Sequence, residues 1–421
     1  MPGILIEINS RKNKNLGKLT HNRSCFARNE IIFDDLYLGL VDFKNKIKGR
    51  TLYLPKEKIA IVIYGDLYLD RKNDKNIKIN DKSLIFIILD LYKKFGIHFV
   101  QKISGSFSLA IHDGKLKKTF VITDQIGSKP VYYRRIENEI VLSSEIKGII
   151  NKESLEYRIE AVYEFLSFSY MLSNKTLFKN IELLPFSSVF IYDHLKKEIN
   201  IKRYGSYNTS DNPGKDYKLD YLLELFDDLF INSVWQRIKN YESIGLFLSD
   251  GIDSRILAGY CKELCDSTKK HLVFYTFGTP GGREDKISRK ISALLDVEYK
   301  FFKIPDDQIS SYADEIVVNG DGHLRIRDAH FIGGFDKLGL THECYLAAYM
   351  ADTVFGKRIS NKLRNVKNRY ELNNYILKNH LRMSVSPLND CVLLFNPITF
   401  HAKIAKKEFH KIVYNFPNMP F

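Results

Sequence analysis

The chain has 421 residues, of which 44% are hydrophobic, and a formal net charge of +14. This length exceeds one ordinary domain, so we expect two or three domains, and the composition excludes a disordered chain. No run approaches the roughly 18 apolar residues of a membrane helix. The first residues also lack the basic and then apolar order of a secretion signal, so we expect a cytoplasmic protein.

The positive charge is spread along the chain rather than gathered in one patch. Lysine alternates with isoleucine and asparagine, as in residues 72–81. Spread charge is typical of a solvated surface, and it does not favour nucleic acid as a partner. Among the cysteines, Cys261 and Cys265 lie one helical turn apart, which indicates a packing face. Neither a disulfide framework nor a zinc site is predicted.

The first half of the chain reads as a β-rich domain over residues 1–204. Short β-branched and aromatic runs such as 59–69 and 119–127 follow one another closely, with one helical interval from Leu84 to Phe95. Closely spaced runs of this kind predict strands joined by turns. The polar residues 205–216 predict a linker to a second domain over 217–421.

After the linker the pattern changes to alternating helices and strands. A long amphipathic helix is predicted from Tyr217 to Lys239, with one apolar face formed by Leu222, Leu225, Phe226 and Leu229. The elements that follow are a strand (244–248), a helix (252–264), a strand (271–277), a helix (284–296, with Ile287, Ile291, Leu294 and Leu295 aligned) and a strand (297–304). Such alternation predicts parallel βαβ units in an open doubly wound sheet, whose ligands bind beyond the carboxyl ends of the strands.

The stretch LFLSDGIDSR, from Leu246 to Arg255, runs an apolar strand into a small polar turn and then into a helix. Backbone N–H groups at such a helix end attract anions, and a nearby carboxylate can hold the Mg²⁺ that accompanies phosphates. The same residue types also occur in turns that only cap a helix. The motif by itself therefore indicates a phosphate site with moderate specificity.

Taken together, the motifs of this chain resemble those of the asparagine synthetase superfamily, which also contains β-lactam synthetase and lasso-peptide cyclases. LSDGIDSR is similar to that family's pyrophosphatase loop, usually Ser-Gly-Gly-x-Asp-Ser. Four N-terminal stretches resemble, in order, landmarks of its glutaminase-like domain: SGSFSLAIHD (104–113), TDQIGSKPVYY (123–133), SSEIKGII (143–150) and TLFKNIELLP (176–185).

The resemblance implies a two-domain fold that combines α+β and α/β classes. The N-terminal domain would be an αββα sandwich of the N-terminal-nucleophile type, like class II glutamine amidotransferases. The C-terminal domain would be an ATP-pyrophosphatase with a doubly wound parallel sheet, like the adenine nucleotide alpha hydrolases.

Two departures from the family concern glutamine hydrolysis. Members that hydrolyse glutamine begin Met-Cys-Gly-Ile and use the cysteine as nucleophile, whereas residues 1–4 here are Met-Pro-Gly-Ile. The family's Asn-Gly-Glu segment, whose Asn helps to bind the oxyanion, appears here as Tyr64 to Asp66. Losing an oxyanion donor costs on the order of 10² to 10³ in rate. Both departures predict an inactive glutaminase.

The resemblance implies that the second domain activates a carboxylate with ATP and Mg²⁺, giving an acyl-adenylate and pyrophosphate before an amine displaces AMP. The metal ligands would be Asp253 and Asp352, the latter in YMADTVFGK, which is similar to the family's Gly-Ala-Asp-Glu-x-Phe-Gly-Gly loop. The residues that would bind ATP or pyrophosphate are Leu248, Ser249, Asp250, Gly251, Asp253, Ser254, Phe277 and Gly278.

Tyr349 and Lys357 are the candidate catalytic residues. Tyr349 stands where asparagine synthetases usually carry Glu and where β-lactam synthetase has a Tyr in a base-providing dyad. A phenol needs a carboxylate partner for that role, and Glu371 is a candidate by chain distance alone; an aromatic that only packs is an equal alternative. Lys357 is a candidate because it directly follows the Asp352 loop, and the chain ends soon after residues 393–409, where family members usually continue to the lysine that stabilises adenylation.

Arg325 and Arg327 are candidate substrate-binding residues, because they place cationic donors before the Asp352 loop. A solvated helix start is the alternative for both. Asp250 replaces the first glycine of the pyrophosphatase loop, and it puts a negative charge and a Cβ where the backbone should approach pyrophosphate. It could instead serve as an added metal ligand.

Three functions compete on these grounds. The first is an AMP-forming amide ligase that joins a small-molecule or peptide carboxylate to ammonia or to an amine of the substrate. The second is a degenerate synthetase that binds nucleotide or a partner without catalysis. The third is an RNA-modifying pyrophosphatase-loop enzyme, which the amidotransferase-like N-terminal half disfavours. A homodimer or a partner subunit is left open.

Overall fold

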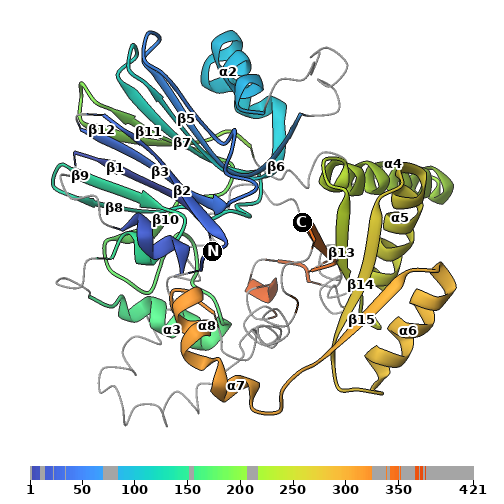
Figure 1. The fold of residues 1–421 in the computed structure, drawn as a ribbon. Coiled ribbons are helices and arrows are strands. Elements are labelled where there is room, and N and C mark those ends of the chain that lie inside the picture. The colour runs from blue at the N-terminus through green and yellow to red at the C-terminus, as the bar shows by residue number, and fades with distance from the viewer. Residues whose placement is uncertain are drawn as a thin grey trace, which may run out of the picture. The chain divides into compact units, whose positions relative to one another are not determined.

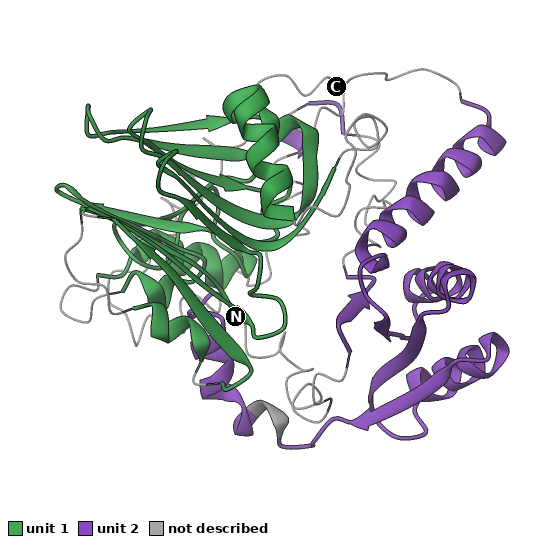
Figure 2. Ribbon diagram, turned by 45° about the horizontal axis from the view of Figure 1, so that its top comes forward, with its two compact units in different colours: residues 1–209, 379–419 green, residues 210–378, 420–421 purple. Residues whose placement is uncertain are grey.

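The computed structural model describes residues 2–9, 15–21, 23–33, 35–69, 84–150, 156–205, 217–324, 338, 342–349, 351, 366–368, 370–372 and 375 (Figure 1). Its contacts divide the chain into two compact units (Figure 2). The described residues of the first unit fall within 1–209, and those of the second fall within 210–378. Most of the expected linker, residues 206–216, lies outside the described residues.

Two six-stranded antiparallel sheets form the first unit. The order in the first sheet is β10-β8-β9-β1-β3-β2, and in the second it is β12-β11-β7-β6-β5-β4. The first sheet contains β1 (Gly3–Ile8), β2 (Phe26–Ile32), β3 (Leu36–Phe43), β8 (Tyr132–Ile136), β9 (Glu139–Ser143) and β10 (Ile181–Leu183). The second contains β4 (Thr51–Leu54), β5 (Ile59–Leu69), β6 (Ile103–Asp113), β7 (Lys118–Thr123), β11 (Ser188–Asp193) and β12 (Glu198–Arg203).

The core of the first unit lies between its two sheets. Because side chains alternate along a strand, Ile4 and Ile6 of β1 join Ala60 and Val62 of β5 in one buried cluster. Leu5 points to the other face of the first sheet and packs with residues of the short 3-10 helices η1 (Leu16–Thr20) and η3 (Ile146–Gly148). The strand predictions for this half of the chain are thus confirmed as a sandwich of facing sheets.

Helix α2 (Leu84–Phe95) covers the outer face of the second sheet. Its residues Ile85 and Ile88 pack against Ile61 and Ile63 of β5. The 3-10 helix η2 (Gly96–Lys102) follows directly, and α3 (Ile159–Phe168) lies between β9 and β10 in the chain. The predicted helix over Leu84 to Phe95 is confirmed with the same bounds.

The second unit contains a parallel four-stranded sheet in the order β15-β14-β13-β16. Its strands are β13 (Ser243–Phe247), β14 (His271–Gly278), β15 (Glu298–Lys303) and β16 (Cys344–Ala347). Its helices are α4 (Leu219–Ile238), α5 (Ile252–Thr268), α6 (Arg283–Leu295), α7 (Gln308–Ser311) and α8 (Ala313–Asn319). The alternation predicted from the sequence is confirmed, because β13, α5, β14, α6 and β15 form successive parallel βαβ units.

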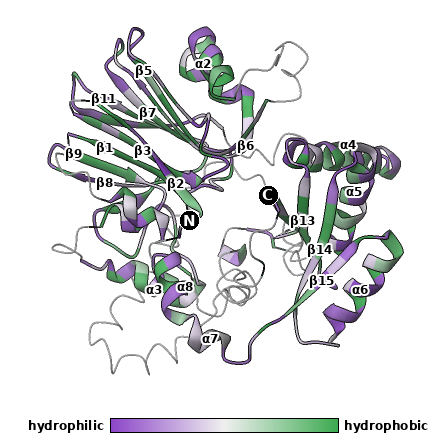
Figure 3. Cartoon of the chain, viewed as in Figure 1, coloured by the Kyte–Doolittle hydropathy of each residue, from purple (hydrophilic) through white to green (hydrophobic). Residues whose placement is uncertain are grey.

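The apolar face predicted for α4 is wrong at Leu222, Leu225 and Leu229, whereas its fourth residue, Phe226, is partly buried and stacks on Phe230. Leu222, Leu225 and Leu229 are 42%, 41% and 53% exposed, whereas Val234 and Ile238 are buried. Apolar and polar residues alternate along the whole of α4, as the interleaved colours of Figure 3 show, but it is the C-terminal half of the helix that packs on the sheet. None of the described helices is both long and apolar enough to cross a membrane.

The buried face predicted for α6 is wrong at Leu294, which is 81% exposed. Ser288 and Ser292 are buried instead. Small side chains let a helix approach a sheet closely. Serine is polar, so a prediction from the spacing of hydrophobic residues does not place it on the buried face. The remaining residues of the predicted face, such as Ile291 and Leu295, are partly buried against the sheet core.

Candidate functional site

Ser254 fixes the shape of the loop that follows β13. Its hydroxyl oxygen accepts a hydrogen bond from the backbone N–H of Ser249 at 3.1 Å, and it lies 3.0 Å from the carbonyl oxygen of Gly251, to which the hydroxyl donates. Leu248 continues the pairing with β14, because its N–H donates to the carbonyl of Tyr275 and its carbonyl accepts the hydroxyl of Thr276, both at 2.8 Å. The loop is therefore held from both of its ends.

Helix α5 begins at Ile252, with Gly251 as an N-cap residue that has no side-chain cap. The first N–H groups of such a helix have no partner within the helix, and the helix dipole favours an anion beside them. Asp253 lies in this first turn. Its carboxylate is a hard oxygen ligand of the kind that Mg²⁺ prefers. The arrangement suits a polyphosphate that brings its own cation.

A cavity of about 560 Å³ opens beside this loop, within the range of small-molecule sites. The predicted ATP and pyrophosphate residues that line it are Leu248, Ser249, Gly251, Asp253, Ser254, Phe277 and Gly278. They come from the ends of β13 and β14, which parallel pairing brings to the same edge of the sheet. Tyr275 and Glu284, which the sequence reasoning did not single out, also line the cavity.

Asp250 is the predicted loop residue that takes no part in this lining. Its carboxylate lies 2.9 Å from Nε of Arg283, the first residue of α6. The Arg283 side chain is 80% exposed and that of Asp250 is 27% exposed. Sequence reasoning missed Arg283, although one signal pointed to it: a cation at the N-terminus of a helix opposes the dipole and calls for an anionic partner.

Tyr349 also lines this cavity and is 85% exposed. It also lines a second cavity, of about 590 Å³, to which Asp253 contributes as well. The carboxylate of Glu371 accepts hydrogen bonds from the Lys367 N–H and the Asn368 side chain, at 3.0 and 3.1 Å. The catalytic role of Tyr349 stays a prediction.

Four predicted site residues lie outside the described residues: Arg325, Arg327, Asp352 and Lys357. Their roles stay predictions. Of the two expected metal ligands, the structure therefore describes Asp253, which lines the cavity beside the loop. This donor fits Mg²⁺, because that ion is commonly held by one or two carboxylates together with the phosphate oxygens of a substrate.

In the first unit, Tyr64 is the residue that the resemblance predicts at the position of the family's oxyanion-binding Asn. Its ring is buried, and Nζ of Lys129 lies 5.0 Å from the ring centroid. Burial lowers the pKa of Lys129, although nearby carboxylates such as Asp66 oppose this effect. Asp66 itself is engaged by Arg50, at 2.9 Å, and Arg50 also donates to the carbonyl of Gly65. Tyr64 thus offers a phenol rather than an amide, and its neighbour Asp66 is ion-paired with Arg50.

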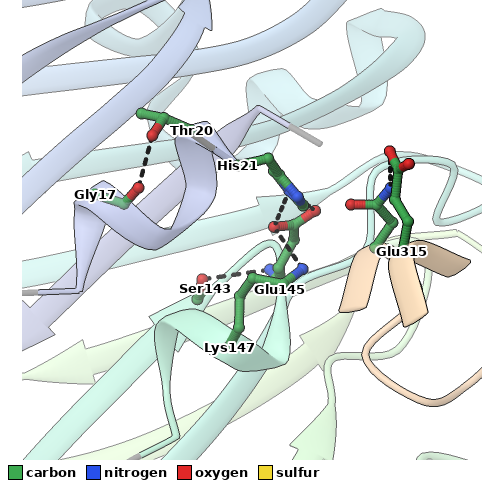
Figure 4. A network of polar contacts seen from close by, with 8 residues as sticks. Gly17, Thr20, His21, Ser143, Glu145, Lys147 and Glu315 are labelled. Atoms are coloured by element: carbon green, nitrogen blue, oxygen red, sulfur yellow. Dashed lines mark hydrogen bonds and ion pairs between the residues drawn. The ribbon is translucent and has the colours of Figure 1, made fainter. Parts of the chain in front are cut away.

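A buried polar network lies next to the start of β1, as the hydrogen bond from the Ser144 N–H to the Ile4 carbonyl shows. In Figure 4, His21 and Lys147 both point toward Glu145, with contacts of 2.9 and 3.0 Å to one carboxylate oxygen. Burial raises the pKa of Glu145, but the hydrogen bonds and positive charges around it, that of His21 first, together hold the pKa below its ordinary value. Glu145 is therefore a charged carboxylate inside the unit.

Sequence comparison finds similarity to a glutamine amidotransferase domain and to asparagine synthetases. The family described as "Glutamine amidotransferase domain" matches residues 17–205. A Methanocaldococcus jannaschii protein provisionally named asparagine synthetase [glutamine-hydrolyzing] 2 is 27% identical, over 87% of this chain and 74% of that protein. Asparagine synthetase [glutamine-hydrolyzing] 2 of Bacillus subtilis is 28% identical over 54% of this chain. The chain spans about three quarters of the first relative and 32% of the second.

Solved structures give weaker likenesses. The glutamine phosphoribosylpyrophosphate amidotransferase from B. subtilis, complexed with ADP and GMP, is 10% identical, with a TM-score of 0.34 over 72% of this chain and 80% of that one. The NH3-dependent NAD synthetase from Campylobacter jejuni is 15% identical, with a TM-score of 0.22 over 47% of this chain and 98% of that one.

Proposed function

We propose that this chain, which belongs to the asparagine synthetase superfamily, is an ATP-dependent carbon–nitrogen ligase that releases AMP and pyrophosphate. The observation that carries the proposal is the cavity at the ends of β13 and β14. The first turn of α5, which includes Asp253, lines this cavity. Uncapped helix N–H groups, a carboxylate and an aromatic residue in one cavity suit a Mg²⁺-nucleotide.

In this proposal the residues of the loop have separate roles. Ser249, Gly251 and Ser254 hold the pyrophosphate portion of ATP, and Phe277 with Gly278 contacts the adenine. Mg²⁺, held by Asp253 and Asp352, would neutralise charge on the phosphates. The proposed site for carboxylate recognition is formed by Arg325 and Arg327.

The proposed reaction has two steps. A substrate carboxylate oxygen attacks the α-phosphorus of ATP, the bond to the β-phosphate oxygen breaks, and pyrophosphate leaves. An amine nitrogen then attacks the acyl carbon, the acyl–oxygen bond breaks, and AMP leaves. Tyr349 accepts the proton that the nitrogen loses, and Lys357 stabilises charge on the phosphates in the first step.

The nitrogen donor in this proposal is ammonia or an amine of the substrate, not glutamine. The residue before β1 is Pro2, whose side chain carries neither thiol nor hydroxyl. Tyr64, covered by Lys129, stands where an amide donor would bind the oxyanion. Two separate requirements of glutamine hydrolysis are thus unsupported by the residues present.

A screen of carboxylates for ATP–pyrophosphate exchange tests the proposal. We expect Mg²⁺-dependent exchange with one class of carboxylate, and we expect Asp253→Ala to abolish it. Asp266→Ala is a matched control, because Asp266 lies on the same helix, pairs with Lys262 and is 60% exposed. Protein that binds no ATP at millimolar Mg²⁺ would instead support the degenerate, non-catalytic alternative. The RNA-modifying alternative has less support, because residues 17–205 match a glutamine amidotransferase domain.

A further inference from the structure

Asp250 presents the proposed function with an electrostatic difficulty. It lies between Ser249 and Gly251, both of which line the cavity assigned to the phosphates of ATP. A carboxylate beside a polyphosphate repels it, because like charges within a few ångströms cost more free energy at a partly buried site than in bulk water. A loop with this residue needs a compensating cation if it is to bind ATP.

Arg283 supplies such a cation from a neighbouring element. Its Nε lies 2.9 Å from the Asp250 carboxylate, so the two groups form an ion pair. Asp250 also lies just before the N-terminus of α5, where the helix dipole favours an anion. Arg283, which does not line the cavity, therefore gives the carboxylate a favourable partner other than the phosphates.

The start of α6 holds Arg283 in place. Asp285 accepts hydrogen bonds from the Gly281 N–H at 2.8 Å and from the Tyr299 hydroxyl at 2.9 Å, and it pairs with Arg289 at 3.0 Å. The bond from Gly281 is the main reason why the pKa of Asp285 lies below its ordinary value. A buried, charged Asp285 thus anchors the turn that presents Arg283 to the loop.

We propose that Arg283 is a positioning residue for ATP, which acts by holding the Asp250 carboxylate out of the phosphate cavity and cancelling its charge. The inference rests on the proposed function, because it concerns the same cavity. It assigns Arg283 an effect on ATP through Asp250 and not through contact with the phosphates. Arg283 is therefore expected to matter for ATP binding only when Asp250 is present.

Calorimetric titration with Mg²⁺-ATP and with adenosine tests this coupling. We expect Arg283→Ala to weaken ATP binding by about tenfold and Arg283→Lys to restore most of the affinity. We expect Asp250→Gly to bind ATP at least as well as the unsubstituted protein, and Asp250→Gly/Arg283→Ala to lie within about twofold of it. Adenosine carries no phosphate, so its affinity is expected to stay unchanged in all four variants.

Lys290→Ala is the matched control, because Lys290 is an exposed cation on the same helix and is not among the residues that pair with Asp250 or Asp285. A double variant that binds ATP as weakly as Arg283→Ala would overturn the inference, since Arg283 would then act on the phosphates directly. Weakened adenosine binding in Arg283→Ala would also overturn it, in favour of a folding role. Failure of the unsubstituted protein to bind ATP would contradict the proposed function itself. That outcome differs from the two above, in which the unsubstituted protein does bind ATP.

Discussion

The Asp250 carboxylate and the Arg283 guanidinium, 2.9 Å apart, join the loop after β13 to the first turn of α6. The pair links two elements that follow neighbouring parallel strands, at the edge of the sheet where the cavity opens. Asp250, which stands where the family usually has glycine, is thus paired with Arg283, whose positive charge compensates its negative charge. Sequence comparison of the loop alone shows the first residue of the pair and not the second.

The coupling between Asp250 and Arg283 should weaken as salt is added. Both side chains reach solvent, and ions screen exposed charges over about 8 Å at physiological ionic strength and about 3 Å at 1 M. We expect the loss of ATP affinity caused by Arg283→Ala to shrink between low salt and about 0.5 M salt, whereas in the Asp250→Gly background Arg283→Ala has little effect at either salt concentration. A loss that is independent of salt would contradict an electrostatic coupling.

Ser254→Ala should lower the free energy of unfolding and weaken ATP binding. The buried hydroxyl accepts the Ser249 N–H and lies within hydrogen-bond distance of the Gly251 carbonyl, so its removal leaves polar backbone groups without that partner. We expect a loss of about 1–2 kcal/mol in the free energy of unfolding, measured by urea titration, together with weaker ATP binding. Ser267→Ala, on the same helix but exposed, should change neither quantity. Equal effects of the two substitutions would contradict the role of Ser254 in shaping the loop.

Glu145→Gln should destabilise the first unit at neutral pH and much less in acid. The pKa of folded Glu145 lies below its ordinary value. The stabilisation is therefore present above the unfolded-state pKa and is lost as the pH falls through the folded-state pKa. We expect a loss of about 2 kcal/mol near pH 7, measured by urea unfolding across a pH series.

Glu156→Gln is the control for this pH series, because Glu156 pairs with Lys179 at the surface and is 70% exposed. We expect no comparable loss for it at any pH. An effect of Glu145→Gln that grows toward acid would show that the sign of the pKa shift is wrong.

Glutamine should donate no nitrogen to the product. Pro2 provides no nucleophile before β1, and Tyr64 provides no amide donor. With amide-labelled glutamine we expect neither glutamate nor labelled product, whereas labelled ammonium enters the product if ammonia is the donor. Glutamate formation coupled to label in the product would refute the assignment of an inactive glutaminase; absence of label from both sources would identify an amine of the substrate as the donor.

Local patterns were sufficient to predict most elements of both units. Helix α2 has the predicted bounds, and the strands and helices from β13 to β15 follow the predicted order with small shifts at their ends. These predictions succeed because periods of two and of 3.6 residues report which faces are buried. They fail at Leu294 and at Leu222, where burial depends on which neighbouring element packs against the helix and not on the helix's own sequence.

The sequence alone determined the alternation of strands and helices and the loop of residues 248–254, since both are encoded by residues close together in the chain. Only the tertiary structure decided what Asp250 contacts. Parallel pairing of β13 with β14 brings the turns after both strands to one edge, so that Arg283 reaches a carboxylate far from it in sequence. Charge compensation of this kind depends on distance in space, which no periodicity along the chain encodes.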